Sequence, residues 1–219
     1  WEHTFSKDFD NNGLISGGSS YLLAGPDGPI TLRGTGGWKP SDASTPNWDA
    51  THAIRTPSGF KVLLTGAAAR SGSFYVWDTN TAGVITNSSG WKTAAQSSSL
   101  NWEHTFSKDF DNNGLISGGS SYLLAGPDGP ITLRNSRGWK PSDASTPNWD
   151  ATHAIRTPSG YKVLLTGAAA LSNKFYVWDV NSAGVITRGS GWKTSLEASS
   201  LNWEHTFSKD FDNNGLISG

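Results

Sequence analysis

The 219-residue sequence contains neither cysteine nor methionine, and only 16% of its residues are charged. Without cysteine the chain can form no disulfide, thiol nucleophile or thiolate metal site. A net charge of −1 offers no basic surface to nucleic acid or to an anionic membrane, so we expect neither as a partner. The sequence has no apolar run near the roughly 18 residues of a membrane-spanning helix, so we expect no membrane insertion. The absence of an initiator methionine leads us to expect a processed or excised segment.

What the sequence does contain is a long repeat. The stretch Trp-Glu-His-Thr-Phe-Ser-Lys-Asp-Phe-Asp-Asn-Asn-Gly-Leu-Ile-Ser-Gly begins at Trp1, at Trp102 and again at Trp203. A fixed period indicates an array in which each repeat buries its apolar face against a neighbour. The chain is therefore two full periods followed by a partial third copy.

Each period contains a second, weaker repeat. Residues 1–5 and 12–15 have the same layout as residues 48–54 and 58–62, and residues 21–32 match residues 75–86. The sequence therefore predicts four structural units of roughly 50 residues each. These units cover residues 1–47, 48–101, 102–148 and 149–202, and residues 203–219 are a partial copy of the first unit.

The local signals inside a unit are those of β-strands. Runs rich in β-branched and aromatic residues occupy residues 154–156, 161–165, 175–179 and 185–187. Turns that end in Gly160 and Gly184 join the first pair and the last pair of runs, because glycine accepts the positive φ that such turns need. Each unit is thus predicted to be a four-stranded meander, and residues 196–201 hint at one short helix.

Four meanders predict an all-β fold of tandem repeats with two possible architectures. A radial arrangement gives a small, four-unit β-propeller, whose closure removes exposed sheet edges. A linear arrangement gives an open repeat array with capped ends. The run Tyr-Val-Trp-Asp, followed by a glycine turn and Val-Ile-Thr, resembles the inner strands of propeller blades and favours the propeller. In either case we expect the 11 tryptophans to pack between units.

Positions that differ between the two periods are expected at the surface, because surface loops tolerate substitution best. These positions include Gly72/Asn173, Ser73/Lys174, Asn87/Arg188 and Thr79/Val180.

The most chemically suggestive motif is an acidic loop inside the repeated stretch. Oxygen ligands at loop positions 1, 3 and 5, followed by a glycine at position 6, are how a calcium loop wraps a hard cation. Position 12, where a full calcium loop has a bidentate carboxylate, is Ser19, so binding is expected to be weak unless another strand supplies oxygen. An Asn-Gly hairpin turn without metal explains the same residues equally well. The candidate calcium ligands are Asp8, Asp10, Asn12, Asp109, Asp111, Asn113, Asp210, Asp212 and Asn214.

Several motifs occur together: Tyr-Val-Trp-Asp-x-Asn-x-x-Gly, Ser-Gly-Trp, Leu-x-Trp-Glu-x-x-Phe and Asp-x-Asp-x-Asn-Gly-x-Ile. Over nearly its whole length the chain resembles the tryptophan-rich tandem repeats at the C-terminal ends of bacterial secreted, haemolysin-type calcium-binding proteins. The resemblance implies a large, non-enzymatic, secreted or cell-surface protein that works in extracellular calcium, with the acidic loops as ion sites. The fifth loop position is Asn here instead of the usual Asp, and the glycine-rich nonapeptides of β-rolls are absent.

Other polar residues do not indicate catalysis. Each unit has one histidine without a neighbouring Cys or His, which is typical of a structural histidine. Glu2 and Asp49 follow tryptophan at equivalent places, but such acids recur in every unit, unlike the single carboxylate pair of a glycosidase. We therefore expect that the chain is not an enzyme.

Two non-enzymatic functions remain. The first is a structural or adhesive repeat module of an exported bacterial protein, with calcium as a stabilising cofactor. The alternative is a lectin-like carbohydrate-binding module, in which exposed tryptophans stack on sugars while Asp and Asn bind their hydroxyls. The partners would be extracellular glycans or other surface proteins, and the identical terminal copies also allow self-association by exchange of the terminal repeat.

Overall fold

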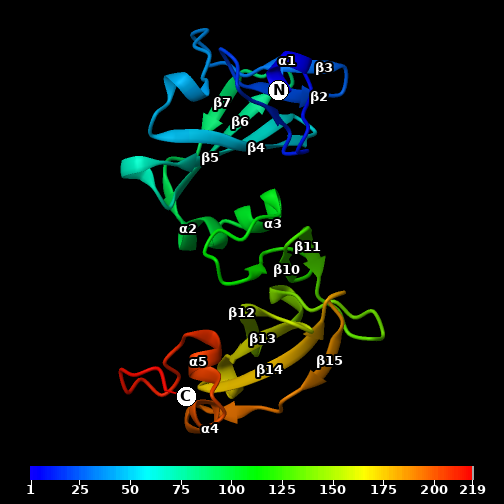
Figure 1. The fold of residues 1–219 in the computed structure, drawn as a ribbon, viewed down its shortest axis with the longest axis vertical. Coiled ribbons are helices and arrows are strands. Elements are labelled where there is room, and N and C mark those ends of the chain that lie inside the picture. Colours follow the sequence, from blue (N-terminus) through cyan, green and yellow to red (C-terminus); the bar gives the residue numbers. More distant parts are fainter. Residues whose placement is uncertain (219) are drawn as a thin grey trace. The chain divides into compact units, whose positions relative to one another are not determined.

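The computed structural model describes residues 1–218, which form two compact units that we describe separately (Figure 1). The first unit is Trp1–Ser97, and the second begins at Ser98. Both units are built mainly from antiparallel β-sheets, which confirms the prediction of an all-β, tandem-repeat protein. No helix among the described residues is long and apolar enough to cross a membrane.

The first unit contains two antiparallel sheets. One has the strand order β1-β2-β3, and the other has the order β4-β5-β6-β7 with β8 also paired to β6. The elements are α1 (Glu2–Phe5), β1 (Leu14–Ile15), β2 (Leu22–Gly25), β3 (Gly28–Thr31), β4 (Trp48–Thr56), β5 (Gly59–Gly66), β6 (Ser73–Asn80), β7 (Ile85–Ser88) and β8 (Lys92–Thr93). Helix α2 (Ala94–Ser99) follows and crosses the division between the units.

The second unit repeats this arrangement and adds two short helices at its C-terminal end. Its sheets have the orders β11-β10-β9 and β12-β13-β14-β15, with β16 paired to β14. The elements are α3 (Trp102–Phe106), β9 (Leu115–Ile116), β10 (Leu123–Gly126), β11 (Gly129–Thr132), β12 (Trp149–Thr157), β13 (Gly160–Gly167), β14 (Lys174–Asn181), β15 (Ile186–Gly189), β16 (Lys193–Thr194), α4 (Ser195–Ser200) and α5 (Trp203–Phe207). Helix α4 confirms the hint at residues 196–201, and a capping box between Thr194 and Glu197 begins it.

The main core of each unit lies between its two sheets. In the second unit Tyr122, Leu124 and Leu133 come from the first half of the period, and Val163 and Trp178 come from the second half. The two halves therefore bury their apolar side chains in one shared cluster, and the first unit has an equivalent cluster. The division into four structural units of about 50 residues stays a prediction, and the main core cluster of each period draws on both of its halves.

The two halves of a period differ in their strands. The second half forms the expected meander, since β12, β13, β14 and β15 are hydrogen-bonded in sequence order. The first half has three strands, and its first five residues do not form the strand that the alignment with residues 48–54 suggested. Glu2–Phe5 is instead a short helix that ends at Ser6 in the left-handed conformation, with φ 51°. The equivalent Trp48–Thr56 is strand β4.

Strand β13 shows how alternate residues serve two faces of the larger sheet. Tyr161, Val163 and Leu165 belong to the main core, whereas Leu164 between them belongs to a second cluster on the opposite face. Both faces of this strand are buried, which explains its nearly continuous apolar run. The β12–β13 turn ends at Gly160, whose φ is 143° and whose missing Cβ leaves room for the carbonyl oxygen of Val180.

Most positions that differ between the periods lie where they were expected. Gly72, Asn173, Asn87 and Arg188 are exposed. The expectation is wrong for Thr79 and its counterpart Val180, because both side chains are buried. Thr79 is accommodated because its hydroxyl accepts a hydrogen bond from the Phe60 amide at 3.2 Å and donates one to the Asn80 carbonyl at 3.1 Å.

Candidate functional site

A buried glutamate organises the repeated stretch. In the third copy Glu204 is fully buried and accepts four hydrogen bonds. The donors are the Ser218 hydroxyl at 2.6 Å, the Ser199 hydroxyl at 2.7 Å, the Ser218 amide at 3.0 Å and the Phe211 amide at 2.9 Å. These bonds, led by that of the Ser218 hydroxyl, lower the pKa of Glu204 to about 2. One carboxylate thus ties together helix α4, helix α5 and the loop that follows it.

The acidic loop next to this glutamate is closed by its own side chains. In the first copy the Asp8 carboxylate accepts a hydrogen bond from the Gly13 amide at 2.8 Å, and Asp10 accepts bonds from the amide and side chain of Asn12. The Asn12 side-chain oxygen accepts the Leu14 amide at 2.7 Å. All these bonds recur in the second copy, and the three backbone-amide bonds recur in the third. The loop therefore has the geometry of the Asn-Gly turn that the sequence offered as one interpretation.

The same loop also gathers three carboxylates. One oxygen from each of Glu103, Asp109 and Asp111 lies within 4.8 Å of the other two, and the first and third copies have the same arrangement. The Oδ1 atoms of Asp109 and Asp210 are buried and have no hydrogen-bond partner among the described residues. Burial, with the like charges of Asp111 and Glu103, raises the pKa of Asp109 to about 6. Burial also raises the pKa of Asp8.

The donor set of this cluster fits a hard divalent cation. Such cations prefer carboxylate oxygens, and the buried, unpartnered Oδ1 atoms supply a ligand atom that no protein donor uses. The structure brings together the aspartates of each predicted ligand set: Asp8 with Asp10, Asp109 with Asp111 and Asp210 with Asp212. The side-chain oxygens of the predicted Asn12, Asn113 and Asn214 accept backbone amides of the loop, and their role as calcium ligands stays a prediction.

Sequence reasoning missed the third carboxylate of each cluster. This third carboxylate lies six residues before the first loop aspartate, at Glu2, Glu103 and Glu204. The calcium-loop pattern places its ligands only within the loop, so it does not include a residue that precedes the loop. The available signal was the fixed pairing of this glutamate with the acidic loop in all three copies.

The tryptophans form an edge-to-face cluster inside each unit. In the first unit Trp77 is contacted by Trp48 at a centroid distance of 5.2 Å and by Trp38 at 6.1 Å, with interplanar angles of 90° and 87°. The second unit repeats these contacts around Trp178. Such geometry is favourable for aromatic quadrupoles. Trp38, from the first half of a period, therefore packs against Trp77 of the second half, and it remains 48% exposed.

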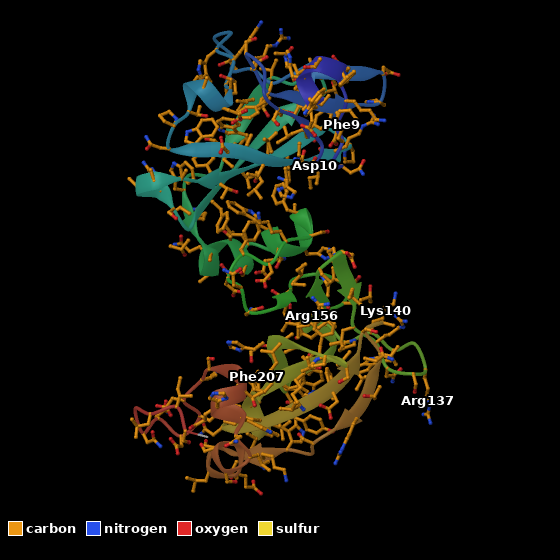
Figure 2. The ribbon with its side chains drawn as sticks, in the orientation of Figure 1. Phe9, Asp10, Arg137, Lys140, Arg156 and Phe207 are labelled. Atoms are coloured by element: carbon orange, nitrogen blue, oxygen red, sulfur yellow. The ribbon has the colours of Figure 1, made fainter. Side chains whose placement is uncertain are left out.

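An open pocket recurs at the same place in both units. In the first unit it has a volume of about 400 Å³ and is lined by Asp27, Arg55, Phe60 and Thr81. In the second it has a volume of about 320 Å³ and is lined by the corresponding Asp128, Arg156, Tyr161 and Ser182. Each lies between the β2–β3 or β10–β11 turn and the larger sheet, and Figure 2 labels Arg156.

The outer face of the larger sheet in the second unit is covered by the third copy of the repeated stretch. Phe207 and Phe211 are only 5% and 3% exposed, and they pack with Leu164, Phe175 and Val177 of the sheet. The Phe175 and Phe211 rings meet at 4.5 Å. Figure 1 shows α4 and α5 beside this sheet, and Figure 2 labels Phe207 on α5.

No protein-family model matches the chain, and neither a curated protein nor a solved structure matches it. The similarity to tryptophan-rich repeats of calcium-binding exported proteins therefore stays an expectation from the motifs.

Proposed function

We propose that the chain is a non-enzymatic, structural or adhesive tandem-repeat scaffold of an exported bacterial protein. The observation that carries this proposal is the use of the repeated aromatic residues. Most tryptophans pack against other side chains, as in the clusters around Trp77 and Trp178. The phenylalanines of the third copy pack on the covered face of the sheet. A scaffold requires such packing, whereas a sugar site needs exposed rings. The secreted or cell-surface location and the adhesive role follow from the motif resemblance.

The architecture that we favour for this scaffold is the open repeat array. A propeller of four equal blades requires four similar sheets. The described residues instead form two three-stranded and two five-stranded sheets, and the smaller sheet of each unit shares a core with the larger one. The four-unit β-propeller remains the alternative.

We further propose that the acidic loops bind calcium as a stabilising cofactor. The residues that would hold the ion in the second copy are Glu103, Asp109 and Asp111. A bound cation would neutralise the repulsion between these carboxylates and give the Asp109 Oδ1 atom a partner. The ion would fix the loop between helix α3 and strand β9.

The experiment that tests calcium binding is a thermal melt in calcium and in chelator, combined with calorimetric titration. A ligand at 100 times its Kd stabilises the folded state by about 2.7 kcal/mol. We expect calcium to raise the melting temperature of the wild type and to leave that of Asp8→Asn/Asp109→Asn/Asp210→Asn, in which every cluster has lost a carboxylate, unchanged. Asp27→Asn, at an exposed turn outside the clusters, is the matched control and should respond like the wild type. Equal melting temperatures of the wild type in calcium and in chelator would contradict calcium binding and leave the Asn-Gly turn as the interpretation of the loop.

The alternative function is carbohydrate binding, favoured by the recurring pocket and by the partly exposed Trp38 and Trp139. An aspartate, an arginine and a hydroxyl side chain line both pockets, and such groups bind sugar hydroxyls. The corresponding test is tryptophan fluorescence during titration with a panel of glycans, with Arg55→Ala/Arg156→Ala as the variant of both pockets. A saturable change that this double variant removes would favour the lectin over the scaffold.

A further inference from the structure

The first copy of the repeated stretch exposes three aromatic side chains whose counterparts in the third copy are buried (Phe207 and Phe211) or partly buried (Trp203). Trp1, Phe5 and Phe9 are 92%, 60% and 51% exposed. The Trp1 and Phe5 rings stack at 6.3 Å, and the Phe5 and Phe9 rings meet edge to face at 6.1 Å. These three rings form one continuous aromatic patch, which we call the N-terminal patch. Patches of this kind commonly mark an interaction site.

The first copy already has the conformation in which the third copy docks. Ser6 and Ser208 both have φ 51°, and Asn11 and Asn213 both have φ 56°. Glu2 accepts the Phe9 amide at 3.0 Å, as Glu204 accepts the Phe211 amide at 2.9 Å. Docking of the first copy would therefore need little rearrangement. This favours binding, because a segment that is already ordered loses little conformational entropy when it docks.

The surface that fits the N-terminal patch is present in this chain. It is the outer face of the β12–β16 sheet, where Leu164, Phe175 and Val177 receive Phe207 and Phe211. The Ser199 hydroxyl at the edge of this face donates to Glu204 at 2.7 Å. Because residues 1–17 and 203–219 are identical in sequence, the same face accepts either segment, and Glu2 can take the bond from Ser199.

We propose that a second copy of this chain docks its N-terminal patch on the outer face of the β12–β16 sheet, in place of residues 203–219. The contact is head-to-tail, because it joins two different surfaces, so each docked molecule still carries a free N-terminal patch or a β12–β16 face that can engage another copy. In the wild type the attached tail competes with an effective concentration on the order of millimolar, which keeps the exchanged form minor in dilute solution. Weakening the tail should release the face for the second copy.

The first test compares full-length variants by sedimentation velocity over a concentration series. Phe207→Ser/Phe211→Ser should form concentration-dependent oligomers, whereas the wild type should stay monomeric in dilute solution. Adding Phe5→Ser/Phe9→Ser should restore the monomer. Association that persists in this fourfold variant would overturn the proposal, because it would come from the bare sheet alone. A monomeric Phe207→Ser/Phe211→Ser variant would also overturn it, whether the face stays empty or the chain's own first copy fills it.

A second test keeps the tail phenylalanines and so does not depend on how well the serine variants fold. The chain has no cysteine, so every disulfide reports a designed pair. Phe9→Cys and Phe175→Cys chains are mixed in an oxidising thiol buffer, because Phe9 corresponds to Phe211 and the Phe211 ring lies 4.5 Å from that of Phe175. We expect several-fold more heterodimer than with Phe9→Cys and Thr187→Cys, where Thr187 is exposed on β15. Equal yields from the two pairs would show random collision and overturn the proposal.

Discussion

The sharpest prediction compares the same substitution at two copies of one sequence. Phe207→Ala removes a side chain that is 5% exposed and packs on the β12–β16 sheet, whereas Phe5→Ala removes its counterpart that is 60% exposed. Truncation of a buried phenylalanine costs about 3–5 kcal/mol. A surface substitution typically changes stability by no more than about 0.5 kcal/mol. The two variants should therefore differ by several kcal/mol although their local sequences are identical.

The measurable cost at Phe207 has an upper limit set by the tail itself. Burial of a phenylalanine stabilises by about 1.5–3 kcal/mol, so Phe207 and Phe211 together give about 3–6 kcal/mol before the cost of ordering the tail is subtracted. A loss of about 3–5 kcal/mol therefore matches or exceeds the net docking energy, so the tail should detach before the sheet unfolds.

The assay is hydrogen exchange with mass spectrometry, together with urea unfolding followed by circular dichroism. In Phe207→Ala the Phe211 amide, which donates to Glu204, should lose its protection, while amides of β13 and β14 keep theirs. Phe5→Ala should leave both sets unchanged. Equal effects of the two variants, or protection of the Phe211 amide in Phe207→Ala, would refute the assignment of the third copy as the cover of this sheet.

Three further predictions concern single residues. Burial raises the pKa of Asp109 to about 6, so its charged form at pH 7 destabilises the folded state. In cation-free buffer, Asp109→Asn should therefore stabilise the protein at pH 7 by about 1 kcal/mol after allowance for solvent screening, since one pKa unit is worth about 1.4 kcal/mol. Urea unfolding measures this gain, and a loss of stability would contradict it. Glu204 has a folded-state pKa of about 2 against an ordinary value of 4.5, so its contribution is complete above pH 4.5 and is lost as pH falls toward 2; Glu204→Gln should flatten this acid limb of the stability curve. Gly160→Ala should destabilise by about 1 kcal/mol or more, because it adds a Cβ against a carbonyl oxygen at positive φ; Gly36→Ala, where an added Cβ meets nothing within 4 Å, is the control.

Strands and turns were predictable because their signals are local. The runs at 161–165 and 175–179 lie in strands β13 and β14, and Gly160 ends the turn between β12 and β13 as expected. The number of cores was not predictable from the half-repeat, because the sequence similarity between halves does not show that Leu133 and Val163 share one cluster. The helix at Trp102–Phe106 was missed because tertiary hydrogen bonds to Glu103 support five residues that are too short to be helical alone.

The acidic site was predictable in part. Alternating aspartates identified the loop, since spacing along one segment is visible in sequence. The role of Glu103 was not, because its approach to Asp109 depends on the fold of helix α3 against the loop. The bond that the Asn113 side-chain oxygen accepts from the Leu115 amide at 2.7 Å was also not predictable from the spacing, because it depends on the loop geometry.

In the third copy the buried Glu204 joins helix α4, which precedes the repeated stretch, to the end of the loop inside that stretch. The same seventeen-residue sequence occurs in each copy. A gene with such identical segments can gain or lose whole periods by homologous recombination within them. Every product of an in-register exchange would keep the same glutamate, the same phenylalanines and the same sheet face at each new boundary. Repeat number could therefore change during evolution without the need to invent a new contact surface, and the length of the assembled protein would be the variable on which selection acts.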